Sequence, residues 1–143
     1  MNRILTVAAL ALAIVVSACS SANSLTSLAS NPMISSLTSS IPGLDATKAI
    51  GAAGSYLAVA EGKMSEADYD AMIDVIPGGK DIKKQALSLG GMDKMMGISD
   101  ANSLMSKLGV TKDQGDKVAA GMSDFISKAG KPDVADKFKK ALM

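Results

Sequence analysis

The chain has 143 residues, with 15 lysine and arginine residues against 14 acidic ones, a single cysteine and no histidine. The two signs of charge are interspersed, so we expect no sequence-independent binding to nucleic acid, which needs clustered basic residues. The missing histidine removes the commonest general base, the Ser-His and Cys-His nucleophile pairs, and histidine-based zinc sites. A Ser-x-x-Lys pair is missing from the sequence as well. We therefore expect a protein that is not an enzyme, with no cofactor and no metal.

The first 18 residues have the order of a secretory signal, in which charge precedes an apolar run and small residues follow it. Arg3 supplies the charge, and Ile4–Val16 forms a run of about 13 residues in which only Thr6 is polar. A membrane-spanning helix needs about 20 apolar residues. The sequence therefore predicts a cleaved signal peptide over residues 1–18.

The cysteine follows this run directly, in the sequence Val-Ser-Ala-Cys at residues 16–19. This motif resembles the lipobox of bacterial lipoproteins. The resemblance implies that Cys19 is the lipidation site and the first residue of the mature protein, attached to the membrane through its acyl chains. The alternative is an ordinary cleavage site beside an incidental cysteine. Ser20 stands where Asp would retain a Gram-negative lipoprotein at the inner membrane, so the resemblance implies the outer membrane.

Two segments follow the signal peptide. Residues 19–31 are rich in serine and carry no charge, which predicts a flexible, lipidated tether. Residues 32–143 show helix signals throughout, with few aromatic residues and no hairpin turns, so we expect one all-α domain built as a small multi-helix bundle. A domain of about 110 residues forms a single modest core.

Start and stop signals mark the expected helices. In chain order they begin after Asn31-Pro32, after Asp45 (to about Glu61), after Ser65 (to Pro77), at Asp81 (through Leu89), after Ser99 or Asp100 (to Leu108), after Thr111 (to Gly130) and after Pro132. The clearest signal is the run Thr-Lys-Asp-Gln at residues 111–114, a capping box before a strongly amphipathic stretch. Small residues at Gly51, Gly54, Ala119 and Gly121 predict close helix packing, within the domain or between copies.

The two halves of the domain look alike. The stretches SLTSSIPGLDATKAIGAAGSYLAVA, from Ser36, and SLMSKLGVTKDQGDKVAAGMSDFIS, from Ser103, share a short helix, a glycine, an aliphatic residue, a capping residue and a long helix containing Ala-Ala-Gly. An internal repeat would make the domain a bundle of two pseudo-repeated halves. Convergence on the same helix-turn-helix chemistry is the alternative.

Three phrases carry a resemblance to a known family: NPMISSLTSSIPGLD, MSEADYDAMIDVIPG and LMSKLGVTKDQGDKVAAGMSDFISKAGKPDVADKFKKALM. They resemble the VcgC/VcgE-type family of uncharacterised bacterial envelope proteins, over about residues 31–143. The resemblance implies an all-helical domain and brings no activity or site residues.

We therefore expect an outer-membrane lipoprotein that acts as a non-enzymatic binding or interaction module, with an envelope protein or a second copy as partner. Two alternatives remain. Met92, Met95 and Met96 could hold Cu(I) through their thioethers, although core packing is the ordinary role of methionine. Glu61 and Glu66, the only glutamates, could act on cell-wall glycans, although the sequence offers few aromatic platforms for sugars.

Overall fold

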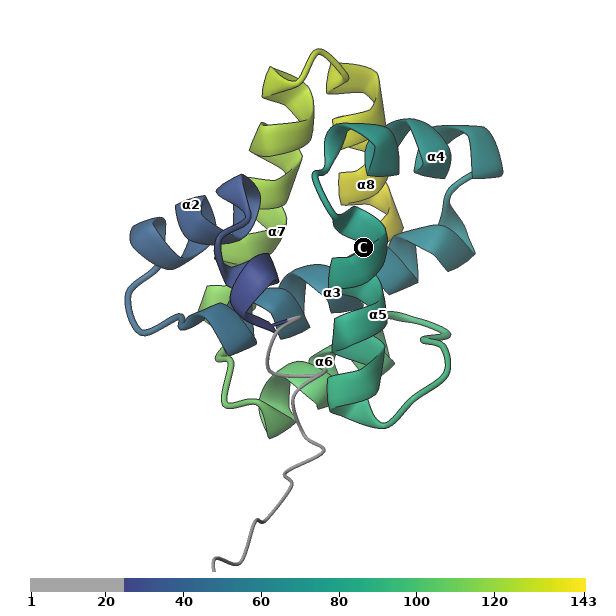
Figure 1. The fold of residues 1–143 in the computed structure, drawn as a ribbon. Helices are drawn as coiled ribbons and strands as arrows, with labels where there is room; N and C mark the ends of the chain where they lie inside the picture. The colour runs from purple at the N-terminus through teal and green to yellow at the C-terminus, as the bar shows by residue number, and fades with distance from the viewer. Residues whose placement is uncertain (1–24) are drawn as a thin grey trace, which may run out of the picture.

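The computed structural model describes residues 25–143, and these form an all-α bundle without strands, as the sequence predicts (Figure 1). After a short helical segment at residues 25–29, the helices are α2 (Pro32–Ser40), α3 (Ala46–Lys63), α4 (Glu66–Val75), α5 (Gly79–Gly90), α6 (Ile98–Lys107), α7 (Lys112–Lys128) and α8 (Pro132–Ala141). No helix in this part of the chain is long and apolar enough to cross a bilayer.

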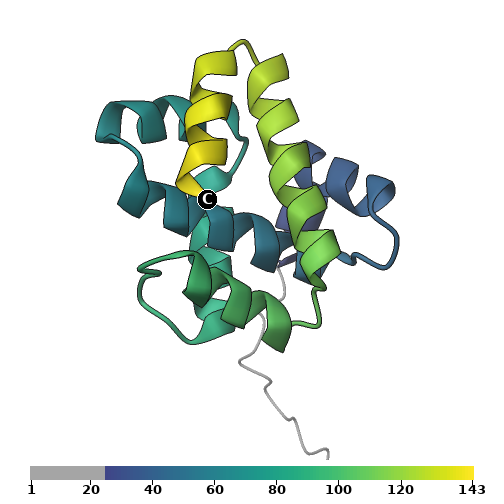
Figure 2. The same ribbon diagram turned by 180° about the vertical axis from the view of Figure 1, so that it is seen from behind.

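Helix α3 is the centre of the bundle. All twelve residues from Ala49 to Ala60 are buried, and α3 packs against α2, α4, α5, α6, α7 and α8. Figures 1 and 2 show it crossing the middle of the molecule, with the antiparallel pair of α7 and α8 on one side and α5 and α6 on the other. A helix that is buried on every side must be apolar on every side. The Ala- and Gly-rich composition of α3 meets this requirement.

Two glycines of α3 let neighbouring helices approach its backbone. A Cβ atom at Gly54 would clash with the Cβ of Ala86 and the carbonyl oxygen of Ile82, both on α5. A Cβ atom at Gly51 would clash with the side chain of Leu108, which follows α6. The small-residue surface that the sequence predicts on α3 therefore serves packing within the domain.

The capping signals place four helix starts correctly. Asn31, Asp45, Ser65 and Thr111 are the N-caps of α2, α3, α4 and α7, and each side chain accepts a hydrogen bond from a backbone N–H of the first turn. The capping box of α7 is complete, because the Gln114 side chain also accepts from the backbone N–H of Thr111 at 3.0 Å. These local signals depend only on neighbouring residues, so sequence alone suffices to find them.

Two other helix starts differ from prediction. Helix α5 begins at Gly79, because Gly78 adopts a left-handed conformation (φ +63°) that lets a new helix start directly after Pro77. Helix α6 begins at Ile98, so neither Ser99 nor Asp100 is its N-cap. The carboxylate of Asp100 accepts a hydrogen bond from the backbone N–H of Met96 at 2.8 Å, outside the helix.

The end of the expected tether packs onto the domain. Residues 25–29 are helical and Leu28 is buried in the core. The side chain of Asn31 accepts from the backbone N–H of Met33 and donates to the carbonyl oxygen of Pro77, which ties this segment to the turn between α4 and α5. This part of the chain therefore differs from the flexible coil that its serine content predicts, because one buried leucine and one buried asparagine fix it.

The two similar halves adopt similar local structures. In each half a short helix (α2 or α6) leads through a left-handed glycine, Gly43 (φ +74°) or Gly109 (φ +72°), to a buried aliphatic residue. A capping residue then starts a long helix (α3 or α7), and a further amphipathic helix follows (α4 or α8). Helix α5 lies in the chain between the two sets of three. The two halves share the order of glycine turn, buried aliphatic residue and capping residue, and their helices have similar lengths, which supports an internal repeat.

Each glycine turn is approached by the long helix of the other half. Gln114, third residue of α7, donates from Nε2 to the carbonyl oxygen of Pro42 at 3.0 Å, beside Gly43. Lys48, third residue of α3, lies with its Cε 3.9 Å from the Cβ position of Gly109. The same position of each long helix thus reaches the turn of the other half, as a pseudo-twofold arrangement requires.

The contact between Gly54 and α5 predicts a large stability effect. We expect Gly54→Ala to lower the free energy of unfolding by about 1–3 kcal/mol or more, because the backbone of α5 must move to admit a methyl group. Gly62→Ala is the matched control in the same helix. Its Cβ would meet no atom within 4 Å, so it should raise stability by about 0.5–1 kcal/mol through helix propensity. Urea unfolding followed by circular dichroism measures both, and equal stabilities of the two variants would contradict the close contact.

Candidate functional site

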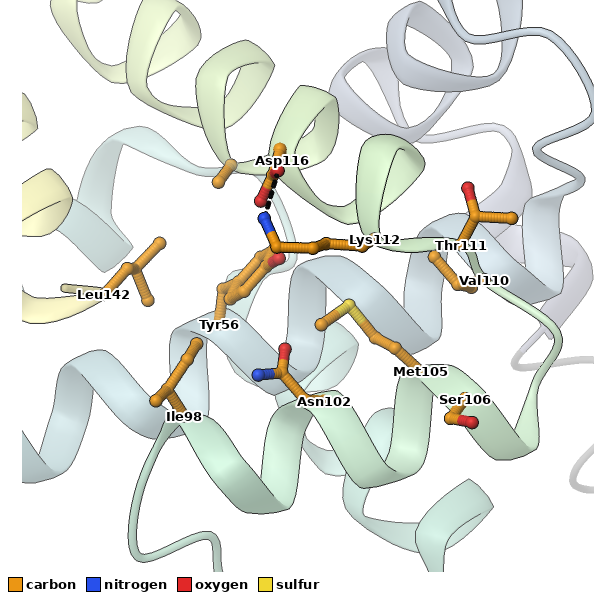
Figure 3. A pocket seen from close by; sticks show the side chains of 11 residues that line it. Tyr56, Ile98, Asn102, Met105, Ser106, Val110, Thr111, Lys112, Asp116 and Leu142 are labelled. Carbon is orange, nitrogen blue, oxygen red and sulfur yellow. Dashed lines mark hydrogen bonds and ion pairs between the residues drawn. The ribbon is translucent and has the colours of Figure 1, made fainter.

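A cleft of about 680 Å³ lies where α6, the start of α7 and the C-terminal end of the chain meet α3 (Figure 3). We call it the Tyr56 cleft, after the α3 side chain at its base. Its other lining residues are Ile98, Asn102, Met105, Ser106, Val110, Thr111, Lys112, Asp116, Ala119 and Leu142. Apolar side chains form most of its wall and polar side chains stand at its rim, which is the usual composition of a small-molecule site.

The start of α7 shapes this cleft. The Thr111 capping box fixes the first turn of the helix, so that Lys112 and Asp116 lie one turn apart at the rim. Between them, Gly115 leaves room for the phenol: a Cβ atom there would lie 2.9 Å from the Tyr56 hydroxyl oxygen and 3.3 Å from the sulfur of Met105. Any larger residue at 115 would push the phenol out of its place.

Tyr56 has a buried ring and a hydroxyl that opens on the cleft. Its residue surface is only 4% exposed, and its hydroxyl forms no hydrogen bond with any other residue in 25–143. Figure 3 shows the phenol among the labelled side chains, below Lys112 and Asp116 and beside Met105. Burial and then the negative charge of Asp116 raise the pKa of Tyr56 to about 12. At neutral pH the phenol is therefore uncharged and free to donate a hydrogen bond to a bound molecule.

The rim of the Tyr56 cleft carries one ion pair. Lys112 Nζ lies 2.8 Å from Asp116 Oδ2, and both side chains are well exposed. The hydrogen bond to Asp116, and then its charge, raise the pKa of Lys112 above its ordinary value. An exposed pair of this kind contributes little to stability and rearranges easily, so either group is available to a polar ligand.

The three methionines of the copper hypothesis lie in one connection between helices. Residues 92–96 are not helical, Met95 is buried in the core, and the adjacent Met96 is 81% exposed. Met92 is half-buried and packs against the core. The three side chains therefore differ in exposure. Among residues 25–143, no three histidine, cysteine, aspartate or glutamate side chains are grouped to hold a metal ion.

Of the other candidate site residues, Glu61 and Glu66 line a second cleft together. Cys19 lies outside the described residues. Glu61 pairs with Lys83 at 2.7 Å, and Glu66 is exposed at the start of α4. Neither lies in the Tyr56 cleft.

Sequence reasoning missed the residues that build the cleft. Tyr56 stands inside an apolar helix, where it is indistinguishable from a core residue, and Gly115 looks like one more helix glycine. Their relation depends on how α7 packs on α3, which no local pattern encodes. The one available signal was a lone tyrosine among small residues, since a buried phenol needs a partner for its hydroxyl.

The pKa of Tyr56 predicts how stability changes at high pH. The unfolded phenol ionises near its ordinary pKa of 10.0 and the folded one at about 12, so the unfolded state binds fewer protons between these values. The stabilisation is therefore complete below pH 10 and is lost as the pH rises toward 12. In a Tyr69→Phe variant, which leaves Tyr56 as the only tyrosine, phenolate absorbance should titrate near pH 12 in the native protein and near pH 10 in denaturant. A native midpoint near 10 would show that the phenol is not buried.

Comparison with known proteins identifies a family and no function. The family model described as "Protein of unknown function VcgC/VcgE (DUF2780)" matches residues 8–142. The match confirms the resemblance found in the sequence and extends it toward the N-terminus, into the expected signal peptide. No similar curated protein and no similar solved structure was found. Since the model covers nearly all of it, this chain belongs to the VcgC/VcgE family of proteins of unknown function.

Proposed function

We propose that this protein is a non-enzymatic binding module, held at the outer membrane by a lipid on Cys19, and that the Tyr56 cleft binds a small amphipathic molecule. The observation that carries the proposal is the phenol of Tyr56: its ring is buried, while its uncharged hydroxyl opens on the cleft and has no hydrogen-bond partner in residues 25–143. A molecule with an apolar body and a carbonyl or carboxylate oxygen would supply what the phenol lacks.

The lining of the cleft supports this class of ligand. Ile98, Met105 and Leu142 offer apolar contact, and a methionine wall adapts to ligands of different shape. Asn102 and the ion pair between Lys112 and Asp116 stand at the rim, where the polar end of an amphipathic ligand remains close to water. The absence of histidine from the sequence favours binding over acid–base catalysis.

The sequence supports the membrane anchor. Charge, the length of the apolar run and the position of Cys19 agree with a lipoprotein signal. Two or more acyl chains give stable anchoring, at about 0.8 kcal/mol per buried methylene group. A binding domain held there would meet amphipathic molecules of the envelope at high local concentration.

The anchor is tested by substitution at the cysteine. Cys19→Ala should abolish metabolic labelling with an acyl-chain analogue and release the protein from the membrane fraction. Ser20→Asp is the control, because it keeps the acylated cysteine and should move the protein to the inner membrane. Unchanged membrane retention of Cys19→Ala would contradict the lipid anchor.

The binding role of the cleft is tested by photo-crosslinking in cells. A benzophenone amino acid at Asn102, on the rim, should yield a specific adduct that mass spectrometry identifies, whereas the same probe at the exposed Asp74 on α4 should not. Adding Tyr56→Phe should lower the Asn102 adduct about 2- to 10-fold, the worth of one hydrogen bond, with the unfolding midpoint measured as a control for folding. Identical adducts at both positions, or none, would count against a binding cleft.

A further inference from the structure

A second cleft lies on another part of the molecule, between the end of α3, α4 and α5. Its volume is about 780 Å³, and we call it the Tyr69 cleft. Its lining residues are Glu61, Met64, Glu66, Tyr69, Asp70, Lys80, Lys83, Lys84 and Leu87. It shares no residue with the Tyr56 cleft, so an inference about it stands apart from the function proposed above.

The two walls of the Tyr69 cleft carry opposite charges. Glu66 and Asp70 are four residues apart on α4 and therefore lie on one face of that helix. Lys80 and Lys84 have the same spacing on α5, near its positive N-terminal end. All four side chains are exposed, and none of them forms an ion pair with another described residue. The cleft thus has an acidic side and a basic side with unused binding capacity.

One ion pair already bridges the two sides. Lys83 Nζ lies 2.7 Å from Glu61 Oε1, and this lysine side chain is only 19% exposed. The same ammonium group lies 5.7 Å from the centre of the Tyr69 ring, so Lys83 covers the aromatic side chain.

Tyr69 provides an independent sign that this cleft is a binding site. The residue is more than nine-tenths buried, and its hydroxyl is the one buried side-chain polar atom of residues 25–143 without a hydrogen-bond partner. Burial, and then the charges of Glu61 and Asp70, raise the pKa of Tyr69 well above its ordinary value. The hydroxyl therefore keeps its proton, and no protein acceptor receives it.

We propose that the Tyr69 cleft binds the phosphoethanolamine group, either as a free molecule or as the headgroup of a phospholipid. Its primary ammonium has three N–H donors and would face the carboxylates of Glu61, Glu66 and Asp70. Its phosphate oxygens would accept from Lys80 and Lys84, and also from Lys83 and the Tyr69 hydroxyl once Lys83 turns from Glu61 to the phosphate.

The charges of the cleft favour phosphoethanolamine over inorganic phosphate or ethanolamine alone. Three carboxylates and three lysines line the cleft, and a ligand that carries both an ammonium and a phosphate gives each wall a partner of opposite charge. Inorganic phosphate alone would lie close to the carboxylates, and ethanolamine alone would lie close to the lysines. Hydrogen bonds between charged groups are the strong ones, and only a ligand with both charges uses both walls.

The test uses the ¹⁵N-labelled full chain in detergent micelles, titrated separately with phosphoethanolamine, inorganic phosphate and ethanolamine. Phosphoethanolamine should give saturable shifts in the amide signals of α4 and α5, with at least about ten-fold higher affinity than either fragment. Equal affinities for phosphoethanolamine and phosphate, or no saturable shift at millimolar concentrations, would overturn the proposal.

Variants assign the binding to the cleft. The double variant Lys80→Gln/Lys84→Gln should weaken phosphoethanolamine binding about ten-fold or more, while Lys131→Gln, an exposed lysine in the turn before α8, should not change it. Tyr69→Phe keeps the ring and should weaken binding about 2- to 10-fold. Full affinity in both the double variant and Tyr69→Phe would show that the ligand binds elsewhere.

Vesicles then distinguish the two sources of the group. Vesicles containing phosphatidylethanolamine should compete with the soluble ligand if the headgroup is recognised in the membrane, whereas phosphatidylcholine, whose ammonium has no N–H, should not compete. Binding of soluble phosphoethanolamine without such competition would assign the cleft to the free molecule. Competition by phosphatidylcholine alone would overturn the predicted contacts with the carboxylates.

Discussion

The whole bundle depends on helix α3 being buried on every side. A central helix surrounded by six others has no face for polar residues. It also needs small side chains wherever another helix packs closely against its backbone. Gly51 and Gly54 meet this need, the first under Leu108 and the second under the backbone of α5. The only hydroxyl on a short side chain in the buried stretch, Ser55, bonds back to the carbonyl oxygen of Gly51 at 2.6 Å and so needs no outside partner. Tyr56 follows Ser55 directly, but its hydroxyl lies too far from the backbone of its own helix to form such a hydrogen bond. The construction of the core thus creates the candidate site.

Helices α3 and α7 occupy corresponding places in the two similar halves and still differ in role. Each begins after a left-handed glycine and a buried aliphatic residue, and each third residue reaches the turn of the other half. Helix α5 breaks the equivalence, because it packs closely on α3 and has no counterpart on α7. With α5 in place α3 is buried on all sides, whereas α7 keeps an exposed face with Lys112, Asp116 and Asp124. The position of α5 therefore makes α3 a core helix and leaves α7 a surface helix, and the Tyr56 cleft lies where the two meet.

The sequence predicts those features that depend on residues close together in the chain. Helix starts at Asp45, Ser65 and Thr111 follow from side chains that bond within one turn, and the amphipathic stripes follow from helical spacing. Helix α6 escapes this reasoning because Asp100, a good capping residue, bonds to Met96 instead of starting the helix. The docking of residues 25–31 escapes it as well, since Leu28 and Asn31 contact the turn near Gly78, more than forty residues away. Both clefts belong to this second class, because each combines helices that only the tertiary fold brings together.

The two tyrosines of the chain share a property that packing alone does not explain. Each is more than nine-tenths buried, and neither hydroxyl has a hydrogen-bond partner in residues 25–143. A buried, unsatisfied polar group costs about 1–3 kcal/mol. Phenylalanine would fill the same space without that cost, and this chain uses it for the equally buried ring of Phe138. The Tyr69 hydroxyl carries this cost because it is fully buried, whereas the Tyr56 hydroxyl opens on its cleft, and unsatisfied buried groups concentrate at functional sites. Since both rings line clefts and both stay protonated at neutral pH, the missing acceptors are best sought in molecules that the two clefts bind.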